Sequence, residues 1–334
     1  MADGVGGGSG SVESARGVDT RAYVYLALMV LIGSSTAPSA KFAVKELPAG
    51  LLPVIRFGVA GLCLLPIALR RGGDFSRLCR EDGWRLVLCA FCCVPLNQTF
   101  FLNAARLTPT SHVALIYAAV PLVVLFLSAA LGQERILASR LGGILASVAG
   151  VGVIGLDSLW RGGSAARATL QGDLLLIGAV VSWGAYLTAS KPLIARHGPL
   201  TVLVATFLVG AALHVPIAVV TAPYWQPLSS ASASAWKGLA FLTLVATVVG
   251  LAFQNLALQR LDASQVATFS NAGPILTVTW GVWLFGESVT PALVVGAALT
   301  LGGIVWASEK VSGANPRLPL DFRRDPLCGP VNGS

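Results

Sequence analysis

Charged residues are scarce in this chain of 334 residues: aspartate, glutamate, lysine and arginine together make up 11% of it. A soluble domain typically carries about 25%. Too few charges are present to cover a surface that faces water, so the composition excludes an ordinary soluble protein. Hydrophobic residues make up 55% of the chain, and its mean hydropathy is +0.75. We therefore expect much of the apolar surface to face lipid.

Catalytic and nucleotide-binding patterns are lacking as well. The three histidines, His112, His197 and His214, are dispersed, and none has the spacing to a carboxylate or thiol that a metal site requires. The sequence has no glycine-rich phosphate-binding loop. We expect no enzymatic activity, no metal, no cofactor and no direct use of ATP.

Cysteine and positive charge are present without the patterns that would give them a special role. Four of the six cysteines lie inside apolar runs, which favours small core residues over a disulfide framework. The net charge of +8 comes mostly from short loops between apolar runs and forms no stripe with interleaved aromatics. This pattern is typical of residues that set membrane topology and face anionic lipid, and it predicts no nucleic-acid partner.

Apolar runs of about 20 residues recur along the chain, and this is the length that crosses a bilayer core as a helix. Ten such runs are expected to be transmembrane helices: 22–40, 48–69, 84–105, 111–131, 140–156, 173–193, 200–221, 236–258, 263–285 and 291–308. The flanking residues 1–21 and 309–334 are rich in small or polar residues and are expected to be disordered tails. The expected fold is an all-α, multi-pass membrane protein.

Ten crossings place both termini on one side of the membrane. That side holds 16 lysines and arginines, the other side holds six, and Arg56 inside a helix completes the total of 23. An excess of positive charge marks the cytoplasmic side. We therefore expect both termini to lie in the cytoplasm.

The two halves of the sequence repeat each other. An offset of 153 residues aligns Pro121 with Pro274 and Glu134 with Glu287, and an offset of 152 pairs Phe101 with Phe253. The repeats are then residues 22–157 and 173–308, each with five helices. An odd number of helices forces the halves into opposite orientations, the inverted-repeat arrangement of many secondary transporters.

Two segments resemble a known family. Residues 118–135 read AAVPLVVLFLSAALGQER, and residues 271–288 read NAGPILTVTWGVWLFGES. Each has a proline inside a helix and a glycine and a glutamate at the helix end, although Gln133 separates them in the first half. This pattern is similar to the EamA-type repeat of the drug/metabolite transporter superfamily. The resemblance implies two five-helix repeats and the transport of amino acids or other metabolites.

Polar and aromatic side chains within the apolar runs are the candidates for substrate binding, because such groups are costly in lipid and usually face a cavity or a partner. Amides and aromatic rings on facing helices suit a polar solute through hydrogen bonds and stacking. The alternative is that they bond to neighbouring helices or to their own backbone. The predicted substrate-binding residues are Thr36, Asn97, Gln98, Tyr117, Trp183, Tyr186, Gln254 and Asn271.

Two further features concern movement and charge. Pro121 and Pro274 each remove a backbone hydrogen bond, so each is expected to kink its helix as a hinge or to shape packing. Arg56 lies inside a helix, where it either extends its charge toward the surface or pairs with a substrate carboxylate. The sequence shows no aspartate or glutamate near a midplane, so it leaves the coupling mechanism open.

These patterns predict a secondary transporter of the cytoplasmic membrane that moves small polar metabolites, amino acids among them, by alternating access. The alternative is a passive channel or facilitator. The expected partners are a small-molecule substrate and membrane lipid, with a second copy of the chain as a further candidate. Substrate identity, direction and coupling ion are not encoded in any pattern that we identify.

Overall fold

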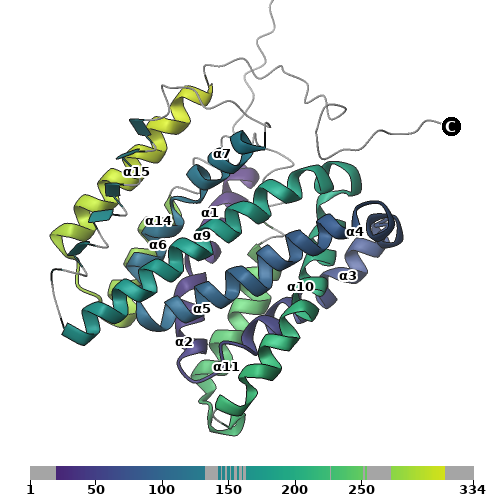
Figure 1. Cartoon of the computed structure of the whole chain (residues 1–334), viewed down its shortest axis with the longest axis horizontal. Coiled ribbons are helices and arrows are strands. Elements are labelled where there is room, and N and C mark those ends of the chain that lie inside the picture. The colour runs from purple at the N-terminus through teal and green to yellow at the C-terminus, as the bar shows by residue number, and fades with distance from the viewer. Residues whose placement is uncertain are drawn as a thin grey trace, which may run out of the picture.

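The computed structural model describes residues 20–131, 163–225, 227–250 and 272–312, together with residue 253 and short pieces of 142–160. These described residues form helices joined by short turns, with no strand among them (Figure 1). The first half contains α1 Thr20–Ser34, α2 Thr36–Val44, α3 Leu52–Arg70, α4 Phe75–Phe91, η1 Cys92–Leu96, α5 Asn97–Leu107, α6 Thr110–Tyr117 and α7 Val120–Ala130.

The second half is also helical in its described part. It contains α9 Gly163–His197, α10 Pro199–Thr221, the short turns η2 Ala222–Tyr224 and η3 Leu228–Ser230, α11 Ala233–Ala240, η4 Phe241–Val249, α14 Ala272–Phe285 and α15 Pro291–Ser312. Gly198 joins α9 to α10 with a φ of 81°, a conformation that favours glycine and turns the chain back sharply.

Six helical spans are long and apolar enough to cross a membrane: Ala27–Val44, Leu52–Arg70, Phe75–Leu107, Thr110–Ala130, Thr169–His197 and Pro199–Thr221. Three shorter apolar helices, Ala233–Val249, Gly273–Phe285 and Pro291–Gly303, fall on the last three predicted runs. The chain is therefore a multi-pass membrane protein. The predicted run 140–156 is described only in pieces, so the count of ten remains a prediction.

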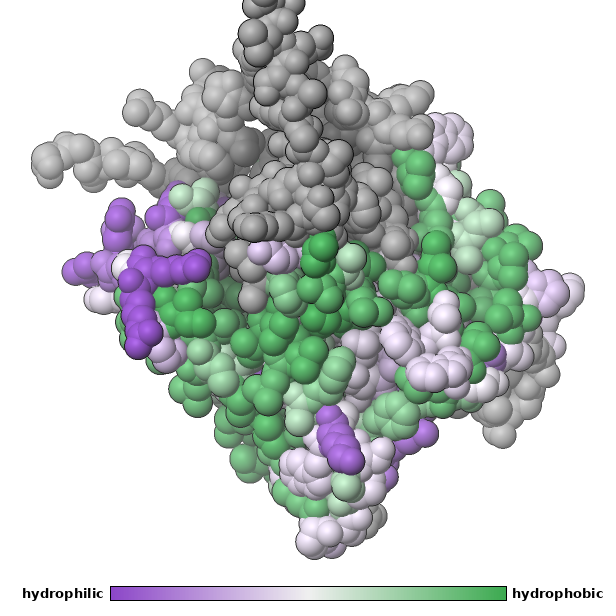
Figure 2. All heavy atoms as spheres, turned by 180° about the vertical axis from the view of Figure 1, so that it is seen from behind, coloured by the Kyte–Doolittle hydropathy of each residue, from purple (hydrophilic) through white to green (hydrophobic). Residues whose placement is uncertain are grey.

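The outer surface agrees with a lipid environment. Apolar side chains form a broad band across the face in Figure 2, while strongly hydrophilic ones gather toward its margins. Large apolar residues such as Leu62, Val219, Val220 and Trp283 are exposed to the surroundings of the protein. Lipid contact explains this exposure, which a water-soluble protein would not tolerate over such an area.

Helix ends differ from the sequence prediction in several places. The first predicted helix, 22–40, is broken at Ser35 into α1 and α2, and α2 continues to Val44. Helix α4 begins at Phe75 rather than at residue 84, because Asp74 caps it by accepting a hydrogen bond from the Arg77 backbone N–H at 2.8 Å. The charged residues of this first part are typical of a loop, and a hydropathy pattern therefore misses the helix.

Pro121 and Pro274, the two predicted hinge or packing residues, each lie in the first turn of a helix. The predicted helix 111–131 is interrupted between α6 and α7, at the two residues that precede the first turn containing Pro121. Pro274 lies in the first turn of α14. A proline lacks the N–H that would continue the preceding turn, which accounts for the interruption before Pro121. A hinge role for either proline stays a prediction.

Two ends of the molecule can be defined from its long helices. Helix α3 has 19 residues and is therefore about 28 Å long. One end, which we call the Lys41 end, contains the end of α2 and the start of α3. The other, the Asp82 end, contains the end of α3 and the first half of α4. Helix α10 runs alongside α3 and joins the same ends, since a Cβ on Gly73 would meet Thr201 and one on Gly50 would meet Thr221.

Two large hydrophobic clusters lie in the interior. One lies toward the Lys41 end and joins α2, α5, α9 and α11 through residues such as Ala43, Leu102, Leu176 and Leu239. The other joins α3, α4, α9 and α10 through residues such as Phe57, Leu86 and Phe207. Both clusters combine residues of the two predicted repeats, so neither repeat has a separate core.

Small residues bring the piece 142–160 close to α15. A Cβ added to Gly150 would lie 2.6 Å from the Gly296 carbonyl oxygen and 2.7 Å from the Thr300 backbone nitrogen. These distances leave no room for a side chain. We expect Gly150→Ala to lower the free energy of unfolding by about 1–3 kcal/mol, the usual cost of overpacking. Thermal unfolding in detergent checks this, with Gly152→Ala as control because a Cβ there meets no atom within 4 Å.

Candidate functional site

A continuous chain of polar side chains crosses the interior. Arg56 donates from Nε to Thr247 Oγ1 at 3.0 Å and from Nη1 to Gln98 Oε1 at 3.3 Å. Gln98 Nε2 donates to Asn97 Oδ1 at 2.7 Å, and Asn97 Nδ2 lies 3.1 Å from the Tyr117 hydroxyl oxygen. Five side chains from α3, α5, α6 and η4 are thus linked in a row. We call this row the polar chain; its members are Thr247, Arg56, Gln98, Asn97 and Tyr117.

The polar chain also contacts a fifth helix, α9. Asn97 Nδ2 donates to the Ala179 carbonyl oxygen of α9 at 2.7 Å. Asn97 and Gln98 are almost completely buried, with 2% and 4% of their surfaces exposed. Buried amides of this kind are satisfied only while the helices keep their positions. A movement of one helix against another would therefore have to exchange these hydrogen bonds.

Two π-helical segments of the backbone, η1 and η4, lie next to or contain residues of the polar chain. Asn97 and Gln98 follow the π-helical segment η1, which contains Pro95, and Thr247 lies within the π-helical segment η4. Thr247 Oγ1 donates to the Leu242 carbonyl oxygen, five residues earlier, at 2.8 Å. Shifting residues 92–96 by the repeat offset of 152 gives 244–248, which falls inside η4. The same irregularity thus occurs at matching positions of the two halves, and such segments are frequent at functional sites.

The polar chain lies well inside the protein. Asn97 is ten residues before Leu107, where α5 ends, a distance of about 15 Å along the helix. Tyr117 is seven residues after Thr110, where α6 begins, or about 10 Å. Both helix termini belong to the Lys41 end. These depths are comparable with half of a hydrocarbon core of about 30 Å.

Arg56 is the charged member of the polar chain. Its side chain is half-buried, and its guanidinium carbon lies 4.9 Å from the centre of the Phe57 ring. Its two hydrogen bonds go to neutral acceptors, Thr247 and Gln98. Within the described part of the chain, no aspartate or glutamate forms an ion pair with it. Among the described residues, the partners of this positive charge are therefore dipoles.

The other predicted substrate-binding residues are placed differently. Trp183 and Tyr186 contact each other with ring centroids 5.0 Å apart and ring planes tilted by 48°, and they pack in the hydrophobic cluster with Phe57 and Leu86. Thr36 is half-buried at the start of α2, beside the break at Ser35. Gln254 and Asn271 lie outside the described residues. The structure thus links Asn97, Gln98 and Tyr117 with Arg56 by hydrogen bonds, whereas Trp183 and Tyr186 pack in the neighbouring hydrophobic cluster.

Sequence reasoning placed Glu287 at a helix end but did not find the partners that give it a role. Its carboxylate is buried and accepts hydrogen bonds from the backbone N–H groups of Thr110 at 2.6 Å and Ser111 at 3.0 Å. Lys41 Nζ lies 3.0 Å from Oε1. Glu287 therefore caps the first turn of α6 and joins α2 and α6 to the end of α14. Its partners lie at least 176 residues away in sequence, beyond the reach of local patterns.

A second acidic cluster lies at the Asp82 end. Asp82 is 3% exposed and forms ion pairs with Arg85 at 3.0 Å and with Arg196 at 3.2 Å. His197 Nε2 lies 3.0 Å from the second carboxylate oxygen. Arg196 and His197 belong to the last turn of α9, while Asp82 and Arg85 belong to α4. The cluster fastens one half of the chain to the other at this end.

A third acidic residue joins the halves near the Lys41 end. Asp173 of α9 accepts a hydrogen bond from Thr108 Oγ1 at 2.6 Å, and its Oδ2 lies 3.0 Å from His112 Nδ1. Asp173 starts a predicted apolar run, but α9 begins ten residues earlier, so this carboxylate lies inside a helix. Two of the three histidines are thus bound to carboxylates. In the part of the chain that the structure describes, no group of three or more metal-ligating side chains occurs.

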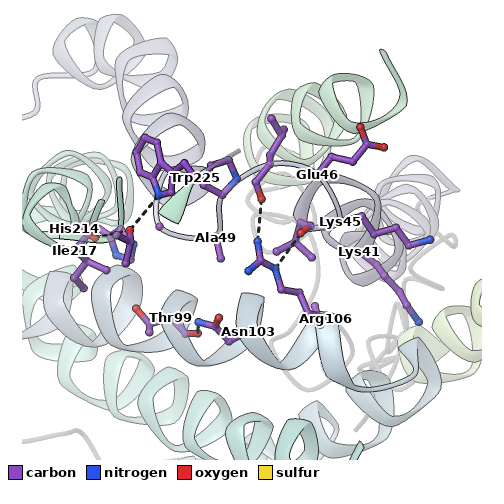
Figure 3. Close-up of a pocket in the computed structure, with 16 residues that line it drawn as sticks. Lys41, Lys45, Glu46, Ala49, Thr99, Asn103, Arg106, His214, Ile217 and Trp225 are labelled. Atoms are coloured by element: carbon purple, nitrogen blue, oxygen red, sulfur yellow. Dashed lines mark hydrogen bonds between the residues drawn. The ribbon is translucent and has the colours of Figure 1, made fainter. Parts of the chain in front are cut away.

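A cavity of about 690 Å³ lies at the Lys41 end, between the α2–α3 connection and helices α5 and α10 (Figure 3). Its charged lining residues are already engaged in part, since Arg106 donates to the carbonyl oxygens of Val44 and Leu47 at 3.0 and 3.2 Å. His214 also lines the cavity, and its side chain is buried beside the Gly50 backbone. The six predicted substrate-binding residues that the structure describes do not line this cavity. We therefore take the polar chain as the candidate site.

Proteins named as exporters of amino acids are similar to this chain. A probable terminal-alkyne amino-acid exporter of Streptantibioticus cattleyicolor is 27% identical over 290 residues, which span 83% of this chain and 94% of that protein. The aromatic amino acid exporter YddG of Ancylobacter novellus is 26% identical over 276 residues, or 82% and 92% of the two chains. The threonine/homoserine exporter RhtA of Escherichia coli K12 is 28% identical over 164 residues, about half of each chain.

The fold is shared with a solved protein as well. A crystal structure with 23% sequence identity covers 88% of this chain and 98% of its own, with a TM-score of 0.61. The sequence pattern of the EamA-like transporters matches residues 20–156 and, a second time, residues 170–308. These two matches together span most of the described helices, and the chain therefore belongs to the EamA-like transporter family.

Proposed function

We propose that this protein is a secondary transporter that moves small polar metabolites across the cytoplasmic membrane by alternating access. The observation that carries the proposal is the row of hydrogen-bonded polar side chains from Thr247 through Arg56, Gln98 and Asn97 to Tyr117. It spans both repeats at membrane depth, and its groups suit a small solute with hydrogen-bonding atoms at both ends.

The proposal includes a topology. Residues 22–157 and 173–308 form two five-helix repeats of opposite orientation, and both termini are cytoplasmic. The ion pairs at the Lys41 end and at the Asp82 end each connect the two repeats. Closing and opening these two sets in turn gives a solute access to the polar chain from one side at a time. A second copy of the chain remains a candidate partner.

Amino acids are the proposed substrate class, with export as the direction. Three relatives are named as exporters of amino acids that differ in side chain, including aromatic and hydroxylated ones. Such variety favours recognition of the common amino and carboxylate groups, for which amides and a tyrosine hydroxyl provide donors and acceptors.

Counterflow in proteoliposomes tests the function. Vesicles that contain the purified protein and a high concentration of one unlabelled amino acid are placed in a trace of the labelled one. A carrier gives transient accumulation of label that saturates with concentration, because one site alternates between the faces. Flux that neither saturates nor shows counterflow would establish the alternative, a channel or facilitator. Repeating the assay with and without a pH gradient identifies proton coupling.

Two substitutions test the site. We expect Asn97→Ala and Tyr117→Phe to lower the initial rate of counterflow about tenfold, since each removes a buried hydrogen bond of the polar chain. Asn103→Ala is the matched control on α5, because Asn103 Nδ2 bonds only within its own helix, to Thr99 O at 2.7 Å. Equal rates in all three variants, at equal levels of inserted protein, would remove the polar chain from the proposal.

A further inference from the structure

The charge on Arg56 has no acidic counterpart within the described protein, and this calls for an explanation. Arginine keeps its charge in proteins, and an uncompensated charge within the membrane is costly. The buried carboxylates differ from Arg56 in this respect, because Asp82 and Glu287 both form ion pairs with basic side chains. Arg56 is instead held by a hydroxyl and an amide oxygen.

We propose that Arg56 is the carboxylate-binding residue of the transport site. The inference rests on the proposed function and narrows it: the substrates are solutes with a carboxylate, and the substrate supplies an anion that no described residue provides. A guanidinium binds a carboxylate through two parallel N–H···O bonds, which gives both strength and a fixed orientation.

The geometry indicates how a carboxylate enters. The two hydrogen bonds of Arg56 engage two of the five guanidinium N–H groups. The bond to Thr247 uses Nε at 3.0 Å and fixes the plane of the group, whereas the bond from Nη1 to Gln98 is the longest of the chain at 3.3 Å. A longer hydrogen bond to a neutral oxygen is the easiest one to exchange for a carboxylate.

Binding at this position also connects the solute to the rest of the chain. When a carboxylate replaces the Gln98 oxygen at Arg56, Gln98 Oε1 is released to accept a hydrogen bond from the solute, while Gln98 Nε2 bonds Asn97 Oδ1. Asn97 contacts Tyr117 and the Ala179 carbonyl oxygen. One ion pair between the solute and Arg56 therefore affects hydrogen bonds that connect α5, α6 and α9. Substrate binding would alter contacts between the repeats, as a carrier requires.

The experiment compares acids with their carboxamides on the same purified protein. Counterflow of labelled L-threonine, L-leucine and L-phenylalanine is measured in proteoliposomes, with each unlabelled amino acid and its carboxamide as competitors. For the wild type we expect each carboxamide to compete at least tenfold more weakly than its acid. Competition by acids and carboxamides at equal concentrations would overturn the inference without any variant.

Variants at Arg56 identify the residue responsible. We expect Arg56→Gln to raise the KM for the amino acid at least tenfold and to abolish the preference for the acid over the carboxamide. Arg56→Lys keeps the charge without the paired N–H groups, and an intermediate KM with a retained preference is expected. Arg70→Gln is the control, since it removes an exposed arginine at the last turn of the same helix.

The outcomes separate the two proposals. Wild-type transport together with an unchanged KM and preference in Arg56→Gln overturns the role of Arg56 and leaves the transport function intact. Absence of counterflow for every solute in the panel contradicts the proposed function, and the inference falls with it. If Arg56→Gln does not insert as a monodisperse protein, the comparison of acids and carboxamides on the wild type and on Arg56→Lys decides.

Discussion

Replacing Glu287 by glutamine is expected to lower the free energy of unfolding by roughly 2–3 kcal/mol, between the values for an exposed and a fully buried ion pair. The variant loses the attraction to Lys41 and leaves that ammonium without its partner at 3.0 Å. It also replaces a charged acceptor of the Thr110 and Ser111 N–H groups by a neutral one. Thermal unfolding in detergent measures the change.

The effect depends on pH with a definite sign. Burial alone would raise the pKa of Glu287, but the Ser111 and Thr110 N–H groups and Lys41 outweigh it and hold the pKa below the usual value. A carboxylate whose pKa is lowered in the folded protein contributes its full stabilisation at pH values above its unfolded pKa, which is about 4.3 for glutamate. This contribution to the free energy of unfolding is lost as the pH falls through the folded pKa. The difference between wild type and Glu287→Gln should therefore be constant near neutrality and shrink in acid.

An exposed pair serves as the control. Arg77 and Glu81 are also 3.0 Å apart, but their side chains are 56% and 45% exposed. Glu81→Gln should change the free energy of unfolding by less than about 1 kcal/mol. Equal effects of the two substitutions would show that burial at Glu287 contributes nothing beyond a surface ion pair. A difference that persists unchanged below pH 4 would contradict the lowered pKa.

Much of the helical fold is predictable from the sequence, because apolar runs of membrane length are a local property. The six long spans and the three shorter helices all overlap predicted runs. The errors occur where a local pattern misleads. The segment from Phe75 to Glu81 contains two arginines and one acid among seven residues but is helical, since Asp74 caps it and its apolar residue Leu78 is buried. A kink at Asp82, where φ is −131°, leads into the rest of α4. Charge alone made the segment resemble a loop.

The site was predictable only in part, because its contacts join residues that are distant in sequence. The cost of amides in lipid singled out Asn97 and Gln98, and the structure places both beside Tyr117. The same rule selected Trp183 and Tyr186, which pack instead in a hydrophobic cluster. No local rule gives Glu287 its partner Lys41, which is 246 residues away. Polarity identifies expensive residues, whereas only the fold shows which group compensates for them.

The ionic contacts of the two ends differ in a way that bears on alternating access. At the Lys41 end, Glu287 and Asp173 each join the halves, with Lys41, His112 and backbone N–H groups as partners. At the Asp82 end, the Asp82 carboxylate contacts both Arg196 and His197. Because one carboxylate takes part in both contacts, a single substitution at Asp82 should weaken both of them at once.

We therefore expect Asp82→Asn to have the largest effect on stability, a loss of about 3–5 kcal/mol in the free energy of unfolding. The carboxylate is 3% exposed and has three basic side chains as partners, two of them arginines. Asparagine keeps a hydrogen-bond acceptor but removes the negative charge that these three side chains share. Arg85, whose side chain is 10% exposed, would then lose its ion pair with Asp82 while remaining buried.

Chemical labelling separates a local opening from general unfolding. Cys93 is fully buried next to the polar chain, so it reports access to the interior when the other five cysteines are replaced. In Asp82→Asn, a membrane-impermeant maleimide should label Cys93 faster from the face that carries the Asp82 end, as measured in inverted membrane vesicles and in intact cells. In Glu287→Gln, labelling should increase from the opposite face. Equal acceleration from both faces in Asp82→Asn would indicate loss of structure, and no acceleration would show that this cluster does not close the path to the site.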